Sequence, residues 1–489
     1  MSGERQWYMA IGGHQVGPVS AEEILSNIQN GSVQPDTLVY TTGMRDWLPQ
    51  ETLLRQRLIE TIGSVYRLYG YLPIDTPAME DLEVLLGKGG GENEKLLFKI
   101  LKRGDKLAQA EQGGKDLADY GLRFDLTVPL ARFVATHQGK LPKVFRRYHI
   151  GPVWRADRPQ LGRYREFYQC DIDVVGGASP DYEVEIITAT ERVLKGLKLG
   201  KYRFRISDKR LLPSLLRGYG VQESQIGPLL IALDKLDKDF NGVRRDVDAL
   251  LGRDSEPWKK VDLLITKAQA ARPQDASRHE RLNYFEEHWK IIQDSSLKAQ
   301  IEDILAGLKT IISSVLAVNQ ESSIVFDPIL VRGMDYYTGP IYEAVVESFS
   351  SSILGGGRYD GLIGTFAGKD IPAVGCSIGF ERILSLLQHR ESPQAAKAER
   401  VLFVRQAGDL VEMTRHAEQL RAAGLAVESY LEEDDLGKQL KYAQAAGITW
   451  AIKQMRADDL SLLVRHLPTR QDRTLSLAEF QALLHNKSG

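Results

Sequence analysis

Two runs of apolar and aromatic residues flank a loop with several arginines in residues 145–176, FRRYHIGPVWRADRPQLGRYREFYQCDIDVVG. Each run has the length and composition of a β-strand, so the segment predicts an antiparallel hairpin with a basic loop. A cationic loop between strands suits phosphate or RNA. The charge pattern alone is equally typical of a solvated charged hairpin. The hairpin is therefore a candidate binding element whose function depends on the rest of the chain.

The bulk properties exclude several classes of protein. With 489 residues the chain is longer than one hydrophobic core usually supports, which predicts roughly three or four domains. The formal net charge of -2 provides no global attraction to nucleic acid or anionic membranes, so any RNA contact must use a local basic surface. The two cysteines are too few for a disulfide framework. We expect a soluble, cytoplasmic protein with no membrane segment and no N-terminal secretion signal.

The N-terminal residues 1–49 alternate strand-like runs with turns around one helix-like run, SAEEILSNIQNG. The WY start, the GP turn, the DTLVY run and the GM..W.P ending resemble a GYF-type module of the bacterial kind. That family has an aromatic surface for proline-rich peptides, which implies such a peptide as a partner. The alternative is that the aromatic side chains form the core of so small a unit. They are Trp7, Tyr8, Tyr40 and Trp47.

The remaining chain divides by pattern. Residues 51–72 carry an amphipathic helical stripe that ends at Gly70, before a strand between prolines. Residues 209–323 are mostly polar with helical periodicity. After the charged linker HRESPQAAKAER, residues 399–489 alternate strand and helix, which predicts a small sheet with βαβ connections.

Three further segments carry residues suited to substrate binding. LRFDLTVPLARF places Asp125 and Thr127 on one side of an extended backbone, where a carboxylate can bind an ammonium group; Thr127 is also a plausible helix N-cap. LVRGMDYYTGPIYEAV offers Arg332 and two tyrosines, but it also fits an ordinary strand entering a turn. ILGGGRYDGLIGTF and IPAVGCSIGFERILSLL combine closely spaced glycines with Arg382 near a helix start.

Three parts of the chain are similar to the three signature motifs of class II aminoacyl-tRNA synthetases: the helix of residues 51–72 with the strand after it, the hairpin of residues 145–176, and the helix start that carries Arg382. LVRGMDYYTG matches the segment specific to histidine enzymes, so the chain resembles the histidyl-tRNA synthetase family. The resemblance implies an α+β multidomain fold with an antiparallel sheet core and helices. It further implies four parts: a GYF-like module (1–49), a catalytic core (50–208 and 324–388), a helical insertion (209–323) and an anticodon-binding α/β domain (399–489). The helix of residues 51–72 matches the motif that forms the dimer interface, although it is also an ordinary amphipathic helix.

The resemblance also implies roles for individual residues. The planar, permanently charged guanidinium group binds phosphate or carboxylate with two hydrogen bonds, as adenylate formation requires. Arg332 and Arg155 are the implied catalytic residues. The histidine substrate is bound by Asp125, Leu126, Thr127, Arg155, Gln169, Asp173, Arg332, Tyr336 and Tyr337. ATP is bound by Arg155, Asp157, Arg163, Phe167 and Arg382. The tRNA acceptor end is guided by Arg158 and Gln160.

The implied reaction is ligation of L-histidine to tRNA(His) with ATP as a substrate and Mg²⁺ as cofactor, in a likewise implied homodimer. The sequence does not identify Mg²⁺ ligands. Lys438, Gln439 and Lys441 are candidate contacts for the anticodon loop. Two alternatives share the fold. One is a regulatory subunit of histidine biosynthesis, a class that usually lacks the anticodon domain and the arginines. The other is an enzyme that adenylates histidine for an acceptor other than tRNA.

Overall fold

The computed structural model describes most of the chain, in two compact units. One unit comprises the described residues of 1–47 and 55–387, and the other those of 48–54 and 388–489. No described helix combines the length and apolar character needed to cross a membrane. The described residues are 7–11, 14–19, 23, 26–27, 39–40, 44–87, 92–113, 116–157, 164–236, 239–270, 289–331, 336–347, 349–390, 400–405, 410–456, 458 and 460–485.

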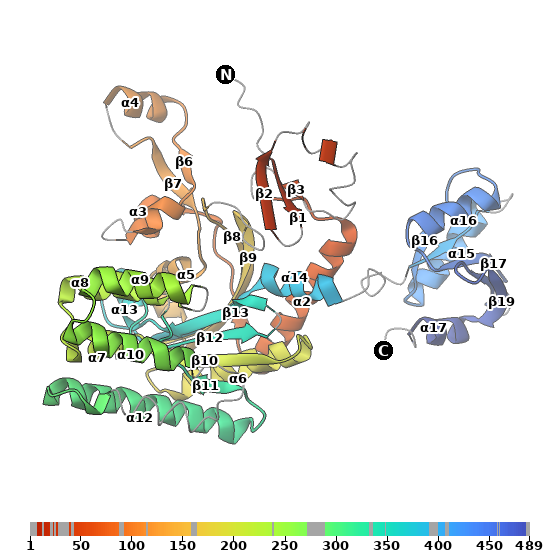
Figure 1. Ribbon diagram of the computed structural model, residues 1–489. Coiled ribbons are helices and arrows are strands. Elements are labelled where there is room, and N and C mark those ends of the chain that lie inside the picture. Colours follow the sequence, from red (N-terminus) through yellow and green to blue (C-terminus); the bar gives the residue numbers. More distant parts are fainter. Residues whose placement is uncertain are drawn as a thin grey trace. The chain divides into compact units, whose positions relative to one another are not determined.

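A predominantly antiparallel sheet forms the centre of the first unit (Figure 1). Only its outermost described pairs, β11 with β10 and β4 with β8, are parallel. The predicted hairpin is confirmed: β8 and β9 pair in antiparallel register from Phe145–Val175 to Trp154–Glu166. The described strands, in their order across the sheet, are β11 (Ile324–Phe326), β10 (Tyr202–Asp208), β12 (Pro340–Val346), β13 (Phe349–Arg358), β14 (Ala373–Gly379), β9 (Glu166–Val175), β8 (Phe145–Trp154) and β4 (Leu72–Pro73).

Helices pack against this sheet through apolar stripes. The predicted N-terminal helix is α2 (Pro49–Leu68), with Leu58 and Ile62 fully or almost fully buried. The chain leaves it through Gly70, whose φ of 79° is the left-handed conformation that glycine adopts readily. The other helices of this group are α5 (Thr127–His137), α6 (Asp181–Gly196), α13 (Asp360–Ala367) and α14 (Phe380–Arg390). The short η3 (Gln138–Lys140), which follows α5, buries no residue.

A second, smaller sheet lies between α2 and α5 in the chain, and the sequence patterns did not predict it. Its order is β5–β7–β6, with antiparallel pairs on both sides of β7. It packs against α3 through Leu82 and Leu85, with Phe124 in the same cluster. The elements of this region are β5 (Met79–Asp81), α3 (Leu82–Leu86), η2 (Glu92–Leu96), β6 (Lys99–Leu101), α4 (Asp105–Gly113) and β7 (Ala118–Leu122).

The described part of residues 209–323 is helical, as predicted. Ile301, Ile304, Leu308, Ile311 and Val315 recur at helical spacing on the inner face of its longest helix, α12 (Ser295–Val318). Asp294 caps α12 by accepting hydrogen bonds from two backbone N–H groups of its first turn. The other described helices are α7 (Leu211–Gly218), α8 (Glu223–Leu233), α9 (Phe240–Leu251) and α10 (Glu256–Ala270).

The second unit contains a mixed sheet of order β16–β15–β17–β18–β19. β15 is parallel to both β16 and β17, so the predicted βαβ connections are confirmed. Trp450, Phe480 and Leu420 belong to its own apolar core. Its elements are β15 (Arg400–Phe403), α15 (Leu410–Ala422), β16 (Ala426–Ser429), α16 (Leu436–Ala445), β17 (Trp450–Met455), β18 (Ser461–His466), β19 (Gln471–Ser476) and α17 (Leu477–His485).

The N-terminal strands form a small antiparallel sheet of order β2–β1–β3. The strands are β1 (Trp7–Ile11), β2 (His14–Val19) and β3 (Val39–Tyr40). Most of the predicted helix SAEEILSNIQNG and the side chains of Trp7, Tyr8 and Tyr40 lie outside the described residues. The choice between a peptide-binding surface and a plain aromatic core therefore stays a prediction.

Candidate functional site

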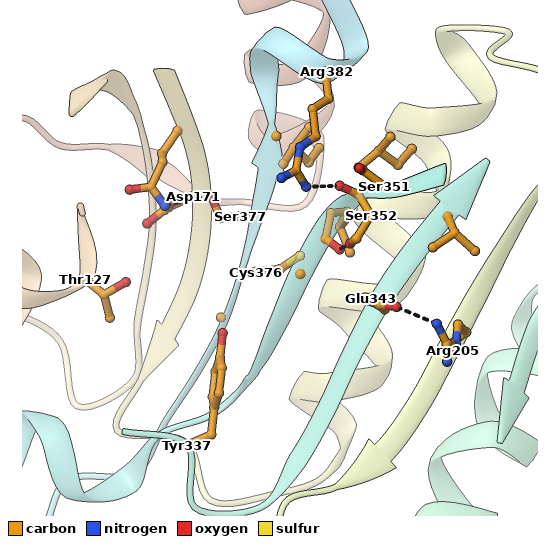
Figure 2. Close-up of a pocket in the computed structure, with 18 of the residues that line it drawn as sticks. Thr127, Asp171, Arg205, Tyr337, Glu343, Ser351, Ser352, Cys376, Ser377 and Arg382 are labelled. Atoms are coloured by element: carbon orange, nitrogen blue, oxygen red, sulfur yellow. Dashed lines mark hydrogen bonds and ion pairs between the residues drawn. The ribbon is translucent and has the colours of Figure 1, made fainter. Parts of the chain in front are cut away.

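A cavity of about 540 Å³ lies on one face of the central sheet. The strand register aligns Asp171 of β9, Ser377 of β14, Gly355 of β13, Glu343 of β12 and Arg205 of β10 in one row beneath it. Side chains directly opposite one another on neighbouring strands share a face, so one row of the sheet provides the cavity floor. Figure 2 shows Thr127 and Asp171 toward one side of the cavity and Glu343 and Arg205 toward the other.

Buried carboxylates form one end of this floor. Asp171 and Asp173 are each 2% exposed. Their counter-ion is Arg147 of β8, which has no solvent exposure. Its Nη2 lies 2.8 Å from Asp173 Oδ2 and 3.9 Å from Asp171 Oδ2, and it donates to the carbonyl oxygen of Leu126 at 3.3 Å. The 2.8 Å approach is an ion pair without the alignment of a hydrogen bond, because Asp173 Oδ2 lacks a hydrogen-bond partner among the described residues.

Burial controls the protonation of these acids. Burial is the largest of several influences that together raise the pKa of Asp171 to about 7. The nearby Asp173 acts in the same direction, whereas Arg147 and a hydrogen bond from Ser377 lower the pKa. Burial also raises the pKa of Asp173, against the effects of Arg147 and of a hydrogen bond with Tyr359. Asp171 Oδ1 has no hydrogen-bond partner in the described part of the chain. Such an unsatisfied, buried acceptor is suited to an N–H donor of a ligand.

Tyrosines enclose the same end. The hydroxyl of Tyr359 donates a short hydrogen bond to Asp173 Oδ1. The ring of Tyr336 packs edge-on against Tyr359 at 5.8 Å and against Tyr337 at 4.9 Å between centroids. Gly375, opposite Asp173 on β14, leaves the space that this carboxylate occupies, since a Cβ there would lie 1.8 Å from Asp173 Oδ1. The result is a polar slot with hydroxyl and carboxylate groups in its wall.

Asp125 is placed behind this wall. It is 1% exposed, and its Oδ1 accepts a hydrogen bond from the Val128 N–H at 3.0 Å in the first turn of α5. Burial raises its pKa, while Arg155 and the backbone donors lower it. Thr127 begins α5 and hydrogen-bonds Tyr336 at the cavity. The helix-capping role considered for Thr127 therefore falls to Asp125.

The end of the cavity near the hairpin loop is lined by arginines and an aromatic ring. The Nε of Arg155 donates to the Phe124 carbonyl at 2.9 Å, and the guanidinium carbon of Arg155 lies 5.1 Å from the centre of the Phe167 ring. Arg382, in the first turn of α14, donates a short hydrogen bond to the carbonyl of Ser352 (Figure 2). Both arginines line the cavity. This end is suited to anionic groups and to a flat ring, whereas the carboxylate end is suited to cationic or N–H groups.

The structure brings many of the predicted residues together. Asp125 and Leu126 are exceptions, because both are buried and neither lines the cavity; Leu126 contributes its carbonyl to Arg147 instead. Arg158, Gln160, Arg163 and Arg332 lie outside the described residues. The predicted residues that line the cavity are Thr127, Arg155, Asp157, Phe167, Gln169, Asp173, Tyr336, Tyr337 and Arg382.

Sequence reasoning missed Asp171, Arg147 and Tyr359. Asp171 could have been found, because it lies between Gln169 and Asp173 in a strand and must share their face. Tyr359 stood in the glycine-rich segment that was already selected, but its bond to Asp173 joins residues 186 positions apart. Arg147 gave no signal beyond the general basic character of the hairpin. No cluster of three or more His, Cys, Asp or Glu side chains among the described residues is arranged to hold a metal ion.

One candidate RNA contact is wrong. Gln439 is 1% exposed, and its side chain hydrogen-bonds the backbone N–H and carbonyl of Arg405 and the carbonyl of Asp434. It therefore ties α16 to the end of β15 and is not available to RNA. Lys438 and Lys441 of the same helix are exposed. Lys438 pairs with Asp434 at 3.0 Å.

An antiparallel sheet with a cationic end and a carboxylate end in one cavity, built on a strand–basic loop–strand hairpin, is consistent with the architecture of class II aminoacyl-tRNA synthetases. The model of the histidyl-tRNA synthetase family matches residues 43–383, and that of GYF domain 2 matches residues 7–53. The chain belongs to the histidyl-tRNA synthetase family.

Relatives of known sequence and structure agree with this membership. A histidine–tRNA ligase of Leifsonia xyli is 40% identical over 423 residues, covering 83% of this chain and 92% of its own length. One of Aeropyrum pernix is 41% identical over 350 residues, covering 70% and 72%. The crystal structure of histidyl-tRNA synthetase from Nostoc sp. PCC 7120 matches with a TM-score of 0.74 at 28% identity, covering 92% of this chain and 99% of its own.

Proposed function

We propose that this chain ligates L-histidine to tRNA(His) in two ATP-dependent steps, through a histidyl-adenylate. The observation that carries the proposal is the single cavity with buried carboxylates at one end and Arg155, Phe167 and Arg382 at the other, in a chain of this family. The alternative of an adenylating enzyme with another acceptor uses the same cavity. The membership and the cavity arginines disfavour the regulatory-subunit alternative.

The carboxylate end receives histidine. Asp173, Tyr336 and Tyr337 face the imidazole ring, whose nitrogens need polar partners because apolar contact alone discriminates weakly between side chains. Asp173 is oriented for this by Tyr359 and Arg147. Thr127 and Gln169 bind the ammonium group, with Asp125 and Leu126 supporting the loop that carries Thr127. Gln169 has an unpaired, buried Oε1 within the described residues, as an ammonium partner requires.

The arginine end receives ATP. Phe167 stacks on adenine and Arg382 covers its other side and the γ-phosphate, while Asp157 lies near the adenine amino group and Arg163 binds the γ-phosphate. Mg²⁺ would be held mainly by phosphate oxygens of ATP, and it would supply positive charge that neutralises the phosphates during transfer.

Adenylation then proceeds by attack of a histidine carboxylate oxygen on the α-phosphorus, with pyrophosphate leaving. Arg155 binds both the attacking carboxylate and the α-phosphate, and Arg332 is the second cation at the α-phosphate. Fixed cations in a cavity that excludes water stabilise the charge that builds up on the transferring group. In the second step a ribose hydroxyl of the tRNA attacks the acyl carbon of the adenylate, and AMP leaves.

The partners follow the family pattern. Arg158 and Gln160 guide the acceptor end, and the C-terminal domain binds the anticodon loop with Lys438 and Lys441. The enzyme is a cytoplasmic homodimer whose interface includes the end of α2 and edge strand β4, where Leu68 and Leu72 are 69% and 63% exposed. The N-terminal module binds a proline-rich peptide. The domain limits stated from the sequence stay part of this proposal.

Two assays test the function. Histidine-dependent ATP–pyrophosphate exchange measures the first step, and charging of purified tRNA(His) measures the second. We expect both activities. Exchange without charging would support the other-acceptor enzyme, and no exchange would support the regulatory subunit.

A further inference from the structure

Arg55 of α2 is buried among aromatic rings. It is 8% exposed, and its guanidinium carbon lies 4.0 Å from the ring centre of Trp47, 4.7 Å from that of Tyr168 and 4.9 Å from that of Phe380. The rings of Tyr168 and Phe380 also contact each other, at 5.4 Å between centroids. A guanidinium group over several ring faces is attracted by each of them, and the attraction is stronger where water is excluded.

The charge of Arg55 is balanced by Glu381. Arg55 Nη1 lies 3.2 Å from Glu381 Oε1, and the glutamate is 5% exposed. Both glutamate oxygens lie 3.1 Å from the Tyr168 backbone nitrogen, which donates to them. Burial raises the pKa of Glu381 to about 7, and Arg55 is the largest influence in the opposite direction. Removing a partner from such a buried pair leaves an uncompensated charge, so the pair is expected to act as one unit.

The neighbours of this cluster in the chain are residues of the nucleotide end. Tyr168 follows Phe167 on β9, and Glu381 precedes Arg382 on α14. The Arg55 cluster therefore contacts both β9 and the first turn of α14. Phe167 and Arg382, proposed to lie on the two sides of adenine, are the immediate chain neighbours of the residues that the cluster joins.

The outer side of the cluster belongs to the junction with the N-terminal module. The Trp47 ring lies between the guanidinium carbons of Arg45 and Arg55, at 3.9 and 4.0 Å. Residues 43–49 match both the module and the synthetase family, so the last residues of one are packing elements of the other. Trp47 therefore links this junction to the buried guanidinium group of Arg55.

We propose that Arg55 is a positioning residue for ATP: through Glu381 and Tyr168 it sets the distance between Phe167 and Arg382, and Trp47 holds it in place. This inference rests on the proposed function only in naming ATP as the ligand of that end. It assigns a role to the segment between the N-terminal module and the catalytic core.

Steady-state exchange kinetics test the role, with Arg55→Met as the main variant. Because misplacement of about 1 Å can cost on the order of a hundredfold, we expect the KM for ATP to rise about tenfold to a hundredfold. The KM for histidine should stay within about twofold of the wild type, within the usual variability of single contacts. Arg55→Lys, which keeps the charge but not the planar group, should recover part of the ATP affinity.

A matched control and a double variant exclude a general loss of stability. Arg67→Met makes the same change on the same helix and removes the contacts of Arg67 with Glu60 and Tyr148, so it should leave both KM values unchanged. Because Arg55 and Glu381 act together, Arg55→Met combined with Glu381→Gln should be no worse than the poorer single variant. Equal rises in both KM values, or effects that add in the double variant, would refute the role.

Calorimetric titration with ATP in the absence of histidine keeps the two proposals separate. If Arg55→Met weakens ATP binding while the wild type shows no exchange, the proposed function fails and the positioning role stands. If exchange is normal and Arg55→Met binds ATP like the wild type, the positioning role fails alone.

Discussion

At the scale of single residues, the cavity has a carboxylate end and an arginine end, and the charged groups at the two ends have different partners. Asp171 and Asp173 are paired with one fully buried cation, Arg147, whose Nε and Nη1 have no hydrogen-bond partners within the described chain. The carboxylates are therefore only partly compensated. Asp171 Oδ1 and Asp173 Oδ2 also lack hydrogen-bond donors among the described residues, and the ammonium and ring N–H groups of the proposed histidine ligand would supply donors that an anion does not have.

Asp171→Asn tests this compensation through stability. The carboxyl pKa rises from 3.8 to about 7 on folding. The folded state therefore binds the proton more tightly than the unfolded state, so the free energy of unfolding falls as pH rises from about 4 to about 7. Over this range the Asp171 carboxyl ionises near Asp173 and Asp125, with Arg147 as the opposite charge. The asparagine removes this loss, on the order of a few kcal/mol. We expect Tm to fall less steeply over this range than in the wild type. Asp119→Asn, which changes a half-exposed carboxylate of β7, is the control and should leave the slope of Tm against pH unchanged. If Asp171→Asn also left this slope unchanged, the prediction would be contradicted.

Arg332→Ala tests the catalytic assignment. A cation that acts mainly on the charge of the transition state is worth about a hundredfold to a thousandfold in rate. We expect the variant to fold and bind ATP but to lose adenylation by this factor in pyrophosphate exchange. Exchange kinetics equal to those of the wild type would remove Arg332 from the proposed mechanism.

At the scale of elements, local patterns predicted what local chemistry determines. The hairpin β8–β9, helix α2, the helical insertion and the βαβ order of the C-terminal sheet follow from periodicity and turn residues. Cross-strand partners such as Asp173 and Gly375 could not be predicted, because their register is set by the whole sheet. The pair of Arg55 and Glu381 could not be predicted either, because these residues lie on two helices and are 326 positions apart in the sequence. The sheet β5–β7–β6 was missed for a related reason: its strands are as short as three residues and show little alternation.

Gly375→Ala tests the register at the histidine end. The added Cβ would lie 1.8 Å from Asp173 Oδ1 and 3.1 Å from the Ile172 carbonyl, so the carboxylate must move. We expect a stability loss of about 1–3 kcal/mol and at least about a tenfold rise in the KM for histidine, which corresponds to about 1.4 kcal/mol. ATP binding should be retained.

The control for this substitution is Gly307→Ala. Gly307 lies on the exposed face of α12 with no atom within 4 Å of the new Cβ, so alanine should stabilise the protein by about 0.5–1 kcal/mol. A Gly375→Ala enzyme with an unchanged KM for histidine would show that the position of Asp173 does not determine histidine binding.

At the scale of the whole molecule, the N-terminal module, the catalytic core and the C-terminal sheet are expected to be needed to different extents for the proposed reaction. Every proposed catalytic and substrate-binding residue lies downstream of residue 50. Deletion of residues 1–41 keeps Arg45 and Trp47 and should leave aminoacylation largely intact. Charging assays with the truncated enzyme check this expectation, and sedimentation checks whether it forms the proposed dimer as the full chain does. A loss of dimer stability would show that the module has a structural role.

Removal of residues 399–489 separates the two steps of the reaction. The C-terminal sheet has its own core around Trp450, Leu462 and Phe480, and no proposed adenylation residue lies in it. The remaining chain should therefore still carry out pyrophosphate exchange. Charging of tRNA should lose at least about tenfold in kcat/KM, since contacts worth about 1.4 kcal/mol or more are lost with the anticodon loop.

A substitution within the domain distinguishes lost RNA contacts from a damaged fold. Lys441→Ala removes an exposed cation of α16 and should weaken charging more at low than at high salt, because salt screens phosphate contacts and already weakens them in the wild type. Gln439→Ala should instead lower Tm, since its buried amide links Arg405 to Asp434. If the truncated enzyme charged tRNA as well as the full chain does, recognition would have to rest on the acceptor end alone.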